Sequence, residues 1–321
     1  MIALLTACGE ESSNGPAIKT KRGTSTDDTQ GLAPPSASYD YTKASAYFSF
    51  DDLITTTGVQ RATTNEIDAL AHATCLMSEG TAPEALCPEL TAGFRDQALN
   101  FNKNGALSCG GGSCDAHDLN QCMTVAGSDS LQLSGTTGFS ISYWVSFPSL
   151  PQGNQVVLSR YTVAGENREY HMGIRYEQCN AAGNTCSGPL RFYFAKSKNG
   201  RRDDDTAVPP ITGNQHFYFS TKTLTAADIG TAGEPIWMNV IFTFDITTLK
   251  AKFYVNGQFD SEHDITEPQV FGGTTAKAMI GCVQLSSSTP DLFLTGKLDD
   301  LVVHKDKIFS ANEIEALSKR P

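Results

Sequence analysis

The sequence lacks the features that mark several common protein classes. Its net charge is −11 at pH 7, so no basic field attracts phosphates, and nucleic acid is disfavoured as a partner. No segment after the first few residues is long and apolar enough to span a bilayer. Neither an HExxH pattern nor a GxSxG nucleophile elbow occurs, and no glycine-rich phosphate loop follows a strand and opens a helix. No residue set therefore argues for an enzyme.

The nine cysteines do not have the spacing of a zinc site. Six of them form three pairs that are close in sequence, and short loops closed by cysteines predict disulfides, which need an oxidising compartment. Cys122 and Cys282 then form a fourth, long-range bridge by elimination. The close pairs are Cys75 with Cys87, Cys109 with Cys114, and Cys179 with Cys186.

The remaining cysteine, Cys8, ends the string LTAC, which resembles the bacterial lipobox. In that motif the cysteine is lipidated and becomes the new N-terminus. The resemblance implies a lipid-anchored protein of the bacterial cell envelope, in the outer membrane or at the cell surface, with residues 1–8 as the remnant of a signal. The segment departs from the pattern, since it has no basic region and its apolar run is shorter than the usual ~7–15 residues. The alternative is an ordinary apolar N-terminus with an odd cysteine.

The chain changes character near residue 44. Residues 9–43 are rich in small and polar side chains and are predicted to be a flexible tether. Many short strand-like runs follow. In FSISYWVSF, residues 139–147, apolar residues alternate with Ser140, Ser142, Trp144 and Ser146, which predicts a half-buried antiparallel strand. The turn signal VNGQ at 255–258 predicts a hairpin. Together these runs predict an all-β fold, a two-sheet antiparallel sandwich.

Two stretches break the strand pattern. Residues 62–79 have apolar residues at helical spacing, which predicts a small helical insert. Near the end, SANEIEAL begins with a capping box formed by Ser310 and Glu313, and it predicts a short C-terminal helix.

The order of these segments resembles a laminin-G-like, concanavalin A-like jelly-roll domain of the bacterial type. The strongest motifs are the hairpin FYVNG and the final strand GKLDDLVVH with the helix SANEIEAL after it. The resemblance implies one jelly-roll domain over residues 44–321, interrupted by an insert at about 58–120. A shared fold does not establish a shared function.

The string EIDALA, Glu66 to Ala71, is similar to the catalytic motif of laminarinase-type β-glucanases. That motif closes with a second glutamate, whereas here the position is Ala71. Glycoside hydrolysis needs two carboxylates across the scissile bond. The context favours a helix, with Thr63 and Glu66 as a capping box. We therefore expect a non-catalytic chain in which this string is a decoy.

The family resemblance implies a structural Ca²⁺ ion held by Asp51 in FSFDD and Asp299 in GKLDDL. Carboxylates and main-chain carbonyls are the hard oxygen ligands that calcium prefers. Because Asp299 is two residues from Leu301, simple alternation places it on the apolar face, where a carboxylate needs a partner. Asp300 then faces the other way and is the weaker candidate. The alternative is a pair of solvated or hydrogen-bonded aspartates.

The ligand-binding residues are less clear from sequence. The loop NGRRDDDT offers Arg201, Arg202 and Asp203 as weak candidates, although a mixed charge run is typical of a solvated loop. The aromatic residues in strands are expected to pack in the core rather than to form a sugar platform. They are Trp144, Tyr170, Tyr176, Tyr193 and Tyr218.

The combined expectation is a lipid-anchored cell-surface module that binds an extracellular glycan or protein without catalysis. A binding head on a mobile tether gains reach and effective concentration. Two alternatives remain open. One is a polysaccharide hydrolase with an unrecognised carboxylate site, and the other is a structural subunit of a surface assembly.

Overall fold

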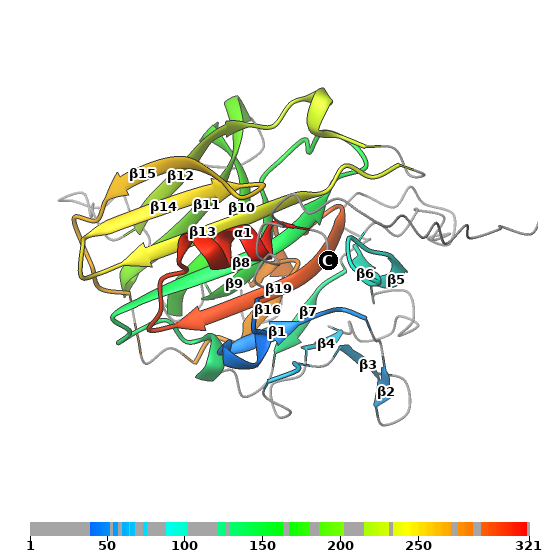
Figure 1. The fold of residues 1–321 in the computed structure, drawn as a ribbon, viewed down its shortest axis with the longest axis horizontal. Coiled ribbons are helices and arrows are strands. Elements are labelled where there is room, and N and C mark those ends of the chain that lie inside the picture. The colour runs from blue at the N-terminus through cyan, green and yellow to red at the C-terminus, as the bar shows by residue number, and fades with distance from the viewer. Residues whose placement is uncertain are drawn as a thin grey trace, which may run out of the picture. The chain divides into compact units, whose positions relative to one another are not determined.

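Two β-sheets pack face to face in the computed structural model of the chain (Figure 1). The predicted signal remnant, Cys8 and the predicted tether up to residue 38 lie outside the described residues. Among the described residues, no helix is long and apolar enough to cross a membrane. The structure describes residues 39–319 except 52–53, 57–59, 64, 68–72, 76–87, 102–120, 126–128, 163–166, 180–185, 202–214, 231–233, 271, 273–274 and 285–289.

The first sheet, called sheet A, has eight strands in the order β15-β14-β13-β8-β19-β6-β5, with β1 also paired to β19. Two short strands, β1 and β6, therefore pair with different parts of the same edge of β19. The strands are β1 Ala46–Phe48, β5 Glu89–Ala92, β6 Gln97–Asn100, β8 Gly138–Ser146, β13 Met238–Asp245, β14 Lys250–Val255, β15 Gln258–Asp264 and β19 Lys297–Lys305.

The second sheet, sheet B, has eleven strands in the order β12-β11-β10-β9-β16-β7-β4-β3-β2, with β17 and β18 off this path. Among the described strands of both sheets, β17 with β9 is the parallel pairing and the others are antiparallel. The strands are β2 Ile54–Thr56, β3 Gln60–Thr63, β4 Ala73–Cys75, β7 Met123–Val125, β9 Gln155–Thr162, β10 Asn167–Cys179, β11 Cys186–Gly200, β12 Gln215–Thr223, β16 Ala278–Ile280, β17 Val283–Gln284 and β18 Pro290–Asp291.

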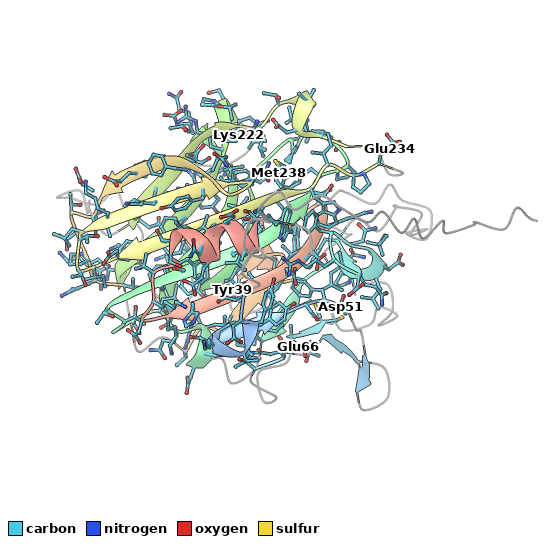
Figure 2. All side chains as sticks on the ribbon, in the orientation of Figure 1. Tyr39, Asp51, Glu66, Lys222, Glu234 and Met238 are labelled. Carbon is cyan, nitrogen blue, oxygen red and sulfur yellow. A yellow bond between two sulfur atoms is a disulfide. The ribbon has the colours of Figure 1, made fainter. Side chains whose placement is uncertain are left out.

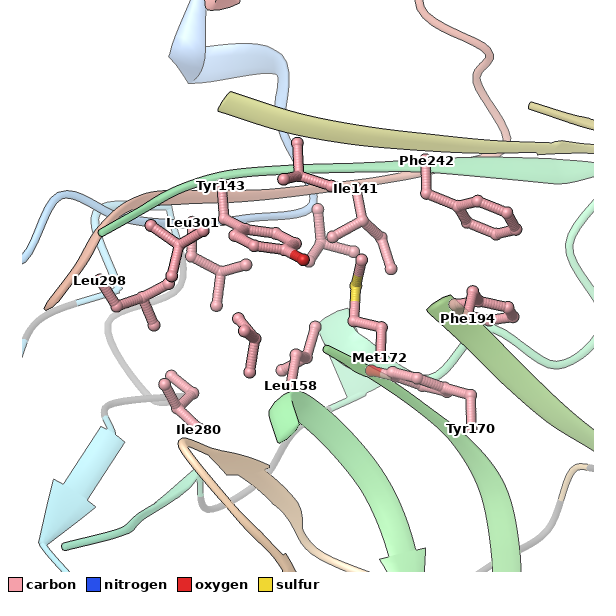
Figure 3. Close-up of a cluster of buried hydrophobic side chains, with 14 of the residues drawn as sticks. Ile141, Tyr143, Leu158, Tyr170, Met172, Phe194, Phe242, Ile280, Leu298 and Leu301 are labelled. Atoms are coloured by element: carbon pink, nitrogen blue, oxygen red, sulfur yellow. The ribbon is translucent and has the colours of Figure 1, made fainter. Parts of the chain in front are cut away.

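The main hydrophobic core fills the space between the sheets, which confirms the predicted jelly-roll sandwich (Figure 3). Alternate side chains of β8 and β13 point down onto alternate side chains of β9, β10 and β11. Phe194 of β11 stacks on Phe242 of β13 with ring centroids 4.4 Å apart. Burial of these apolar side chains contributes most of the driving force for folding.

Strand β8 is buried on both faces, so the prediction of a half-buried strand was wrong. Its inner face packs in the core, and its outer face lies under the C-terminal helix α1, Ala311–Leu317. Ser140 Oγ donates to the Lys307 carbonyl at 2.9 Å and accepts from the Phe309 amide at 3.0 Å. Serine is small enough to let this segment lie directly on the sheet.

The C-terminal helix begins as predicted. Ser310 caps it, and Ser310 and Glu313 form a reciprocal capping box. Its buried face carries Ile314 and Leu317, which join a second hydrophobic cluster on the outside of sheet A. The short helix η1, Tyr41–Lys43, packs in the same cluster through Tyr39 and Ala44 beside it. The protein therefore covers this face with its own chain.

The VNGQ hairpin also forms as predicted. Asn256 and Gly257 have φ values of 51° and 75°, in the left-handed region that a tight hairpin turn requires. The turn joins β14 to β15, the edge strand of sheet A.

The predicted helix over residues 62–79 does not form where the structure describes this segment. Strand β3 ends at Thr63, and Ala73–Cys75 is strand β4, which pairs with β7. The Thr63–Glu66 capping box is also wrong, because the Glu66 amide donates to the Tyr47 carbonyl at 2.8 Å. Long-range pairing thus overrides the helical spacing. Residues 68–72, which include most of EIDALA, lie outside the described residues.

Candidate functional site

The first candidate site lies at the edge of β19 that pairs with both β1 and β6. Strand β1 pairs with β19 from Leu301 onward, and β6 pairs with it at Lys297 and Leu298. Asp299 and Asp300 lie between these two pairings, at a β-bulge in the pairing of β19 with β8. Asp300 has a left-handed φ of 46°, a conformation that aspartate tolerates better than most residues. The extra residue of the bulge shifts the alternation of side chains by one.

This shift places Asp299 on the outer face of sheet A, so the prediction that it points inward was wrong. Its register partner is Trp144, whose indole nitrogen donates to the Leu317 carbonyl of helix α1 at 3.1 Å. Leu298, one residue earlier, is opposite Val145 and lies in the main core. Sequence alternation alone could not detect the bulge.

Asp299 is nevertheless fully buried, at 0% exposure. Its Oδ2 accepts from the Arg95 amide at 2.9 Å, whereas its Oδ1 lacks a hydrogen-bond partner among the described residues. Burial, followed by the charge of Asp300, raises the pKa of Asp299 to about 8. A buried carboxylate with an unpaired oxygen is costly, so this group holds a proton or needs a cation.

Asp300 is buried too, at 3% exposure, although the sequence marked it as the weaker candidate. Its Oδ2 lies 2.9 Å from Arg95 Nε, and its Oδ1 accepts from the Tyr47 hydroxyl at 2.7 Å. Burial raises the pKa of Asp300 to about 6, while Tyr47 and Arg95 act in the opposite direction. This carboxylate is already satisfied by protein partners.

Asp51, which Figure 2 labels, follows β1. It bonds to Gln97, in the same β5–β6 hairpin as the Arg95 amide that bonds to Asp299. Its Oδ1 accepts from the Gln97 amide at 3.0 Å, and its carbonyl accepts from Gln97 Nε2 at 2.9 Å. Both residues of the predicted calcium site therefore bind the turn between β5 and β6.

Oxygen atoms converge beside Gly93 in this turn. A Cβ atom at Gly93 would lie 2.5 Å from the Gln97 carbonyl oxygen and 2.6 Å from both the Arg95 carbonyl oxygen and Asp299 Oδ2. One carboxylate and two carbonyls are a donor set that suits Ca²⁺. No group of three or more His, Cys, Asp or Glu side chains in the described part of the chain is arranged to hold a metal. A cation here would depend on main-chain oxygens.

The second candidate site is on the outer face of sheet B. Strands β10, β11 and β12 send alternate residues into the core, among them Tyr170, Phe194 and Tyr218. The residues between them point outward and include several aromatic rings. We call this surface the outer aromatic face; its rings are Tyr161, His171, Tyr193, Phe217 and Phe219.

The rings of this face contact one another. His171 Nδ1 lies 2.7 Å from the Tyr193 hydroxyl, and the ring of His171 meets Tyr161 edge-on at 4.9 Å between centroids. Phe217 and Phe219 are half-buried, and their rings lie nearly parallel, 6.2 Å apart. Burial lowers the pKa of His171 to about 3, with smaller effects from Arg175 and Arg168. His171 is therefore neutral at pH 7.

Arg175 completes the outer aromatic face. Its guanidinium carbon lies 4.7 Å from the centroid of the Phe217 ring, within the range of a cation–π contact. Gly173 precedes it on the same face, where the backbone of strand β9 fills the place of a side chain. Any Cβ there would lie 2.1 Å from the Gln155 carbonyl oxygen, so the close approach of strand β9 requires glycine.

Phe217, Phe219 and Arg175 were not predicted from the sequence as site residues. Tyr193 was predicted to be buried, and it is, at 1% exposure, although its side chain is on the outer side of sheet B. The signal was present in HFYFSTK and EYHMGIRY, where a period of two separates inward from outward aromatics. Trp144 is buried as expected, beneath helix α1 and against Phe94.

The weak ligand candidates in the NGRRDDDT loop are largely untested. Arg201 is exposed at the end of β11, and its carbonyl accepts from Ser197 Oγ at 2.9 Å. Arg202 and Asp203 lie outside the described residues.

The disulfide predictions are confirmed in part. Cys122 is bonded to Cys282, across 160 residues of sequence. Cys75 is also disulfide-bonded. Cys179 and Cys186 are directly opposite each other in the pairing of β10 with β11, and their bond stays a prediction. Cys87, Cys109 and Cys114 lie outside the described residues.

Comparison with known proteins places these features in a family. The sequence profile of the concanavalin A-like lectin/glucanases superfamily matches residues 121–315. No curated protein matches the chain.

Several solved structures have a similar fold. Domain 4 of AbnA, a GH43 extracellular arabinanase from Geobacillus stearothermophilus solved in complex with arabinotriose, has a TM-score of 0.50 and 15% identity, and the match covers 86% of this chain and 98% of that chain. The binding domain of Paraclostridial Mosquitocidal Protein 1 has a TM-score of 0.48 and 13% identity, over 87% of this chain and 52% of that chain. The CBM40 domain of a Ruminococcus gnavus IT-sialidase, bound to α2,6-sialyllactose, has a TM-score of 0.40 and 14% identity, over 57% and 84%. At 15% identity, the likeness to the arabinanase domain concerns the fold alone.

Proposed function

The chain belongs to the concanavalin A-like lectin/glucanases superfamily, and we propose that it is a non-catalytic module that binds a glycan through its outer aromatic face. Membership in a superfamily of lectins and glucanases leaves the activity open. The observation that carries the proposal is the row of half-buried rings Phe217 and Phe219 beside Arg175. Aromatic rings pack against the apolar faces of sugars, while polar groups at their rim bond to hydroxyls.

The acids of this region support binding rather than hydrolysis. Strands β10, β11 and β12 contain two acidic residues, Glu169 and Glu177. Glu169 is fully buried, 3.1 Å from Arg160 Nε, and it accepts from two main-chain amides. Glu177 Oε2 lies 3.6 Å from Arg191 Nη1. A glycosidase needs two carboxylates free to face the scissile bond, and neither of these is free.

Affinity electrophoresis of the full chain through gels that contain neutral and acidic polysaccharides tests this proposal, with the same gels assayed for new reducing ends. We expect retardation without reducing ends. Phe217→Ala should abolish retardation, because a central aromatic contact of an interface costs ~2 kcal/mol or more when truncated. Phe259→Ala is the matched control, since this phenylalanine is 59% exposed on β15 of the other sheet.

The outcomes separate the candidates. New reducing ends would establish a hydrolase. Retardation that survives Phe217→Ala would place the binding surface elsewhere. No retardation by any polysaccharide would reject glycan binding as tested and favour a protein partner.

A calcium ion at the turn between β5 and β6 is part of the proposal. Asp299, Asp51 and the carbonyls of Arg95 and Gln97 would hold it. The unpaired Oδ1 of Asp299 and the oxygens that converge beside Gly93 support this donor set. We expect Ca²⁺ to raise the melting temperature of the chain and Asp299→Asn to remove that rise. A melting temperature that is equal in Ca²⁺ and in chelator would reject the site.

The lipid anchor at Cys8 also remains a proposal, supported by the LTAC string. Expression in a bacterium fed an alkyne-labelled fatty acid tests it. The wild type should incorporate the label and fractionate with the outer membrane, and Cys8→Ser should do neither. An unlabelled wild type would reject the anchor and with it the envelope location.

A further inference from the structure

The outer aromatic face is a cationic patch on an acidic protein. The whole chain has a net charge of −11. On this face, Arg168 lies over the Tyr161 ring at 5.6 Å and Arg175 lies over the Phe217 ring at 4.7 Å. Arg191 on β11 adds a third guanidinium. Glu177 Oε2 lies 3.6 Å from Arg191 Nη1.

Arg175 differs from the other two arginines in its partners. Arg191 Nη1 has the Glu177 carboxylate at 3.6 Å, and Arg168 Nη1 donates to the Gly200 carbonyl at 3.3 Å. Within the described residues, no carboxylate lies at ion-pair distance from Arg175. Arg175 is half-buried, and its guanidinium carbon lies over the Phe217 ring at 4.7 Å from the centroid.

The positive charges of Arg175 and Arg168 both act on His171, in the middle of this face. Arg175 and Arg168 each lower the pKa of His171, which has its side chain between them on β10. His171 remains neutral and keeps its contact with the Tyr193 hydroxyl. The face therefore combines apolar rings with a positive potential, and nothing acidic on β10, β11 or β12 is free to cancel it.

We infer that the glycan bound at the outer aromatic face carries carboxylate groups, and that Arg175 recognises them; this inference rests on the proposed function. The planar guanidinium presents parallel N–H donors that match the two oxygens of a carboxylate. The sugar ring packs on Phe217 and Phe219, and its carboxylate meets the donors of Arg175 beside them. Arg175 is the specificity-determining residue, whereas the rings supply affinity for sugars in general.

The test compares acidic polymers with their own neutral forms. Polygalacturonate, alginate, hyaluronan and polysialic acid are each assayed by affinity electrophoresis beside a carboxyl-reduced sample of the same polymer. We expect the full chain to bind at least one acidic polymer about 10- to 100-fold more tightly than its reduced form, the range for a charge-assisted pair. Arg175→Gln should bring that ratio close to one.

Arg191→Gln is the matched control, because it removes the same charge from the same sheet at a residue that already has a carboxylate partner. We expect it to change the ratio less than about threefold. Arg175→Lys, which keeps the charge but loses the planar fork, should retain only part of the preference. Circular dichroism and the melting temperature establish that each variant is folded. If Arg175→Gln does not fold, the binding ratio of Arg175→Lys tests the role of Arg175 instead.

Each result has a distinct meaning. Equal binding of acidic and reduced polymers would overturn the inference and leave the proposed function standing. Equal losses in Arg175→Gln and Arg191→Gln would overturn the role of Arg175 in favour of general electrostatics. Binding of dextran sulfate as tight as that of the best carboxylate polymer would overturn carboxylate recognition. Failure to bind any polymer, acidic or neutral, would instead overturn the proposed function itself.

Discussion

The two sheets carry different side chains on their outer faces. On sheet A, the outward residues of β8 include Ser140 and Ser142, and residues 307–317, with helix α1, lie over this face. On sheet B, the outward residues of β12 include Phe217 and Phe219, which are half-buried. Small polar residues suit a face that another part of the same chain covers closely. Large rings beside a cation suit a face that receives a partner, since such residues concentrate binding energy.

This difference predicts that truncation of an outward aromatic side chain mainly lowers stability on sheet A and mainly lowers glycan binding on sheet B. Trp144→Ala on sheet A removes a ring that stacks on Phe94 and an indole that bonds to the Leu317 carbonyl at 3.1 Å. We expect the free energy of unfolding to fall by about 3–5 kcal/mol, the cost of deleting a buried large aromatic. Urea denaturation measures this loss.

Phe217→Ala on sheet B should cost less stability, because that ring is only half-buried, and yet it should abolish glycan binding. Phe259→Ala, at 59% exposure, should change neither quantity appreciably. If folded Trp144→Ala lost glycan binding while Phe217→Ala kept it, the assignment of roles to the two faces would be reversed.

The second prediction concerns His171, at the centre of the outer aromatic face. Burial lowers its pKa to about 3, below the ordinary value of 6.5. Between these values the unfolded chain binds a proton that the folded protein does not, so stability falls as the pH falls. The expected slope is about 1.4 kcal/mol per pH unit below pH 6.

For Glu169 and Asp299 the slope of stability against pH has the opposite sign, because burial raises their pKa values to about 7 and about 8. The folded protein holds their protons while the unfolded chain releases them, so they destabilise the fold as the pH rises. The difference between wild type and His171→Gln isolates the histidine. This difference, measured by urea denaturation at pH 4, 5, 6 and 7, should shrink toward acid. A constant difference would mean that His171 is not buried as described.

Much of the architecture follows from local sequence patterns. The alternation in FSISYWVSF, the Asn256-Gly257 turn and the Ser310–Glu313 capping box are each determined by neighbouring residues, and each is found as predicted. What covers a strand is not local. Strand β8 was predicted to be half-buried because its sequence cannot reveal that a segment more than a hundred residues later packs on its outer face, with Phe309 against Ser140 and Leu317 against Trp144.

The errors in the candidate sites have the same origin. Asp299 was predicted to face inward because alternation was extended through Asp300, where a bulge interrupts it. The helix at 62–79 was predicted from spacing, whereas Asn65 and Glu66 bond to Tyr47 and β4 pairs with β7. In each strand of sheet B, alternate side chains form two sets, one facing sheet A and one facing outward. The sequence of a single strand does not determine which set faces outward, so it could not predict the outer aromatic face.

A third prediction tests how the two sheets are joined at their edges. Asp260 on β15 accepts from the main-chain amides of Thr221 at 2.6 Å and Lys222 at 2.8 Å on β12. These bonds connect the edge of sheet A to the strand that carries Phe217 and Phe219. Asp260→Ala should lower the free energy of unfolding by about 1–3 kcal/mol, because two amides lose their acceptor.

Asp260→Asn, which keeps one acceptor oxygen, should retain part of that stability. Glycan affinity should fall only slightly in either variant, since no contact residue is removed. Loss of binding in Asp260→Ala together with retained binding in Phe217→Ala would show that the edge, rather than the aromatic face, contacts the glycan.

The smallest effect is expected at a paired cation on sheet A. Lys250 Nζ lies 2.8 Å from both Glu262 and Asp264 on the neighbouring strand, and these bonds, first to Asp264 and then to Glu262, raise its pKa. The cluster is solvent-exposed, so salt screens it. Lys250→Ala should lower the melting temperature slightly at low ionic strength and not at all in high salt. It should leave the binding of acidic polymers unchanged, because its charge is already neutralised by its own sheet. If Lys250→Ala weakened that binding as much as Arg175→Gln, the contrast between a paired cation on one face and an unpaired cation on the other would not explain recognition.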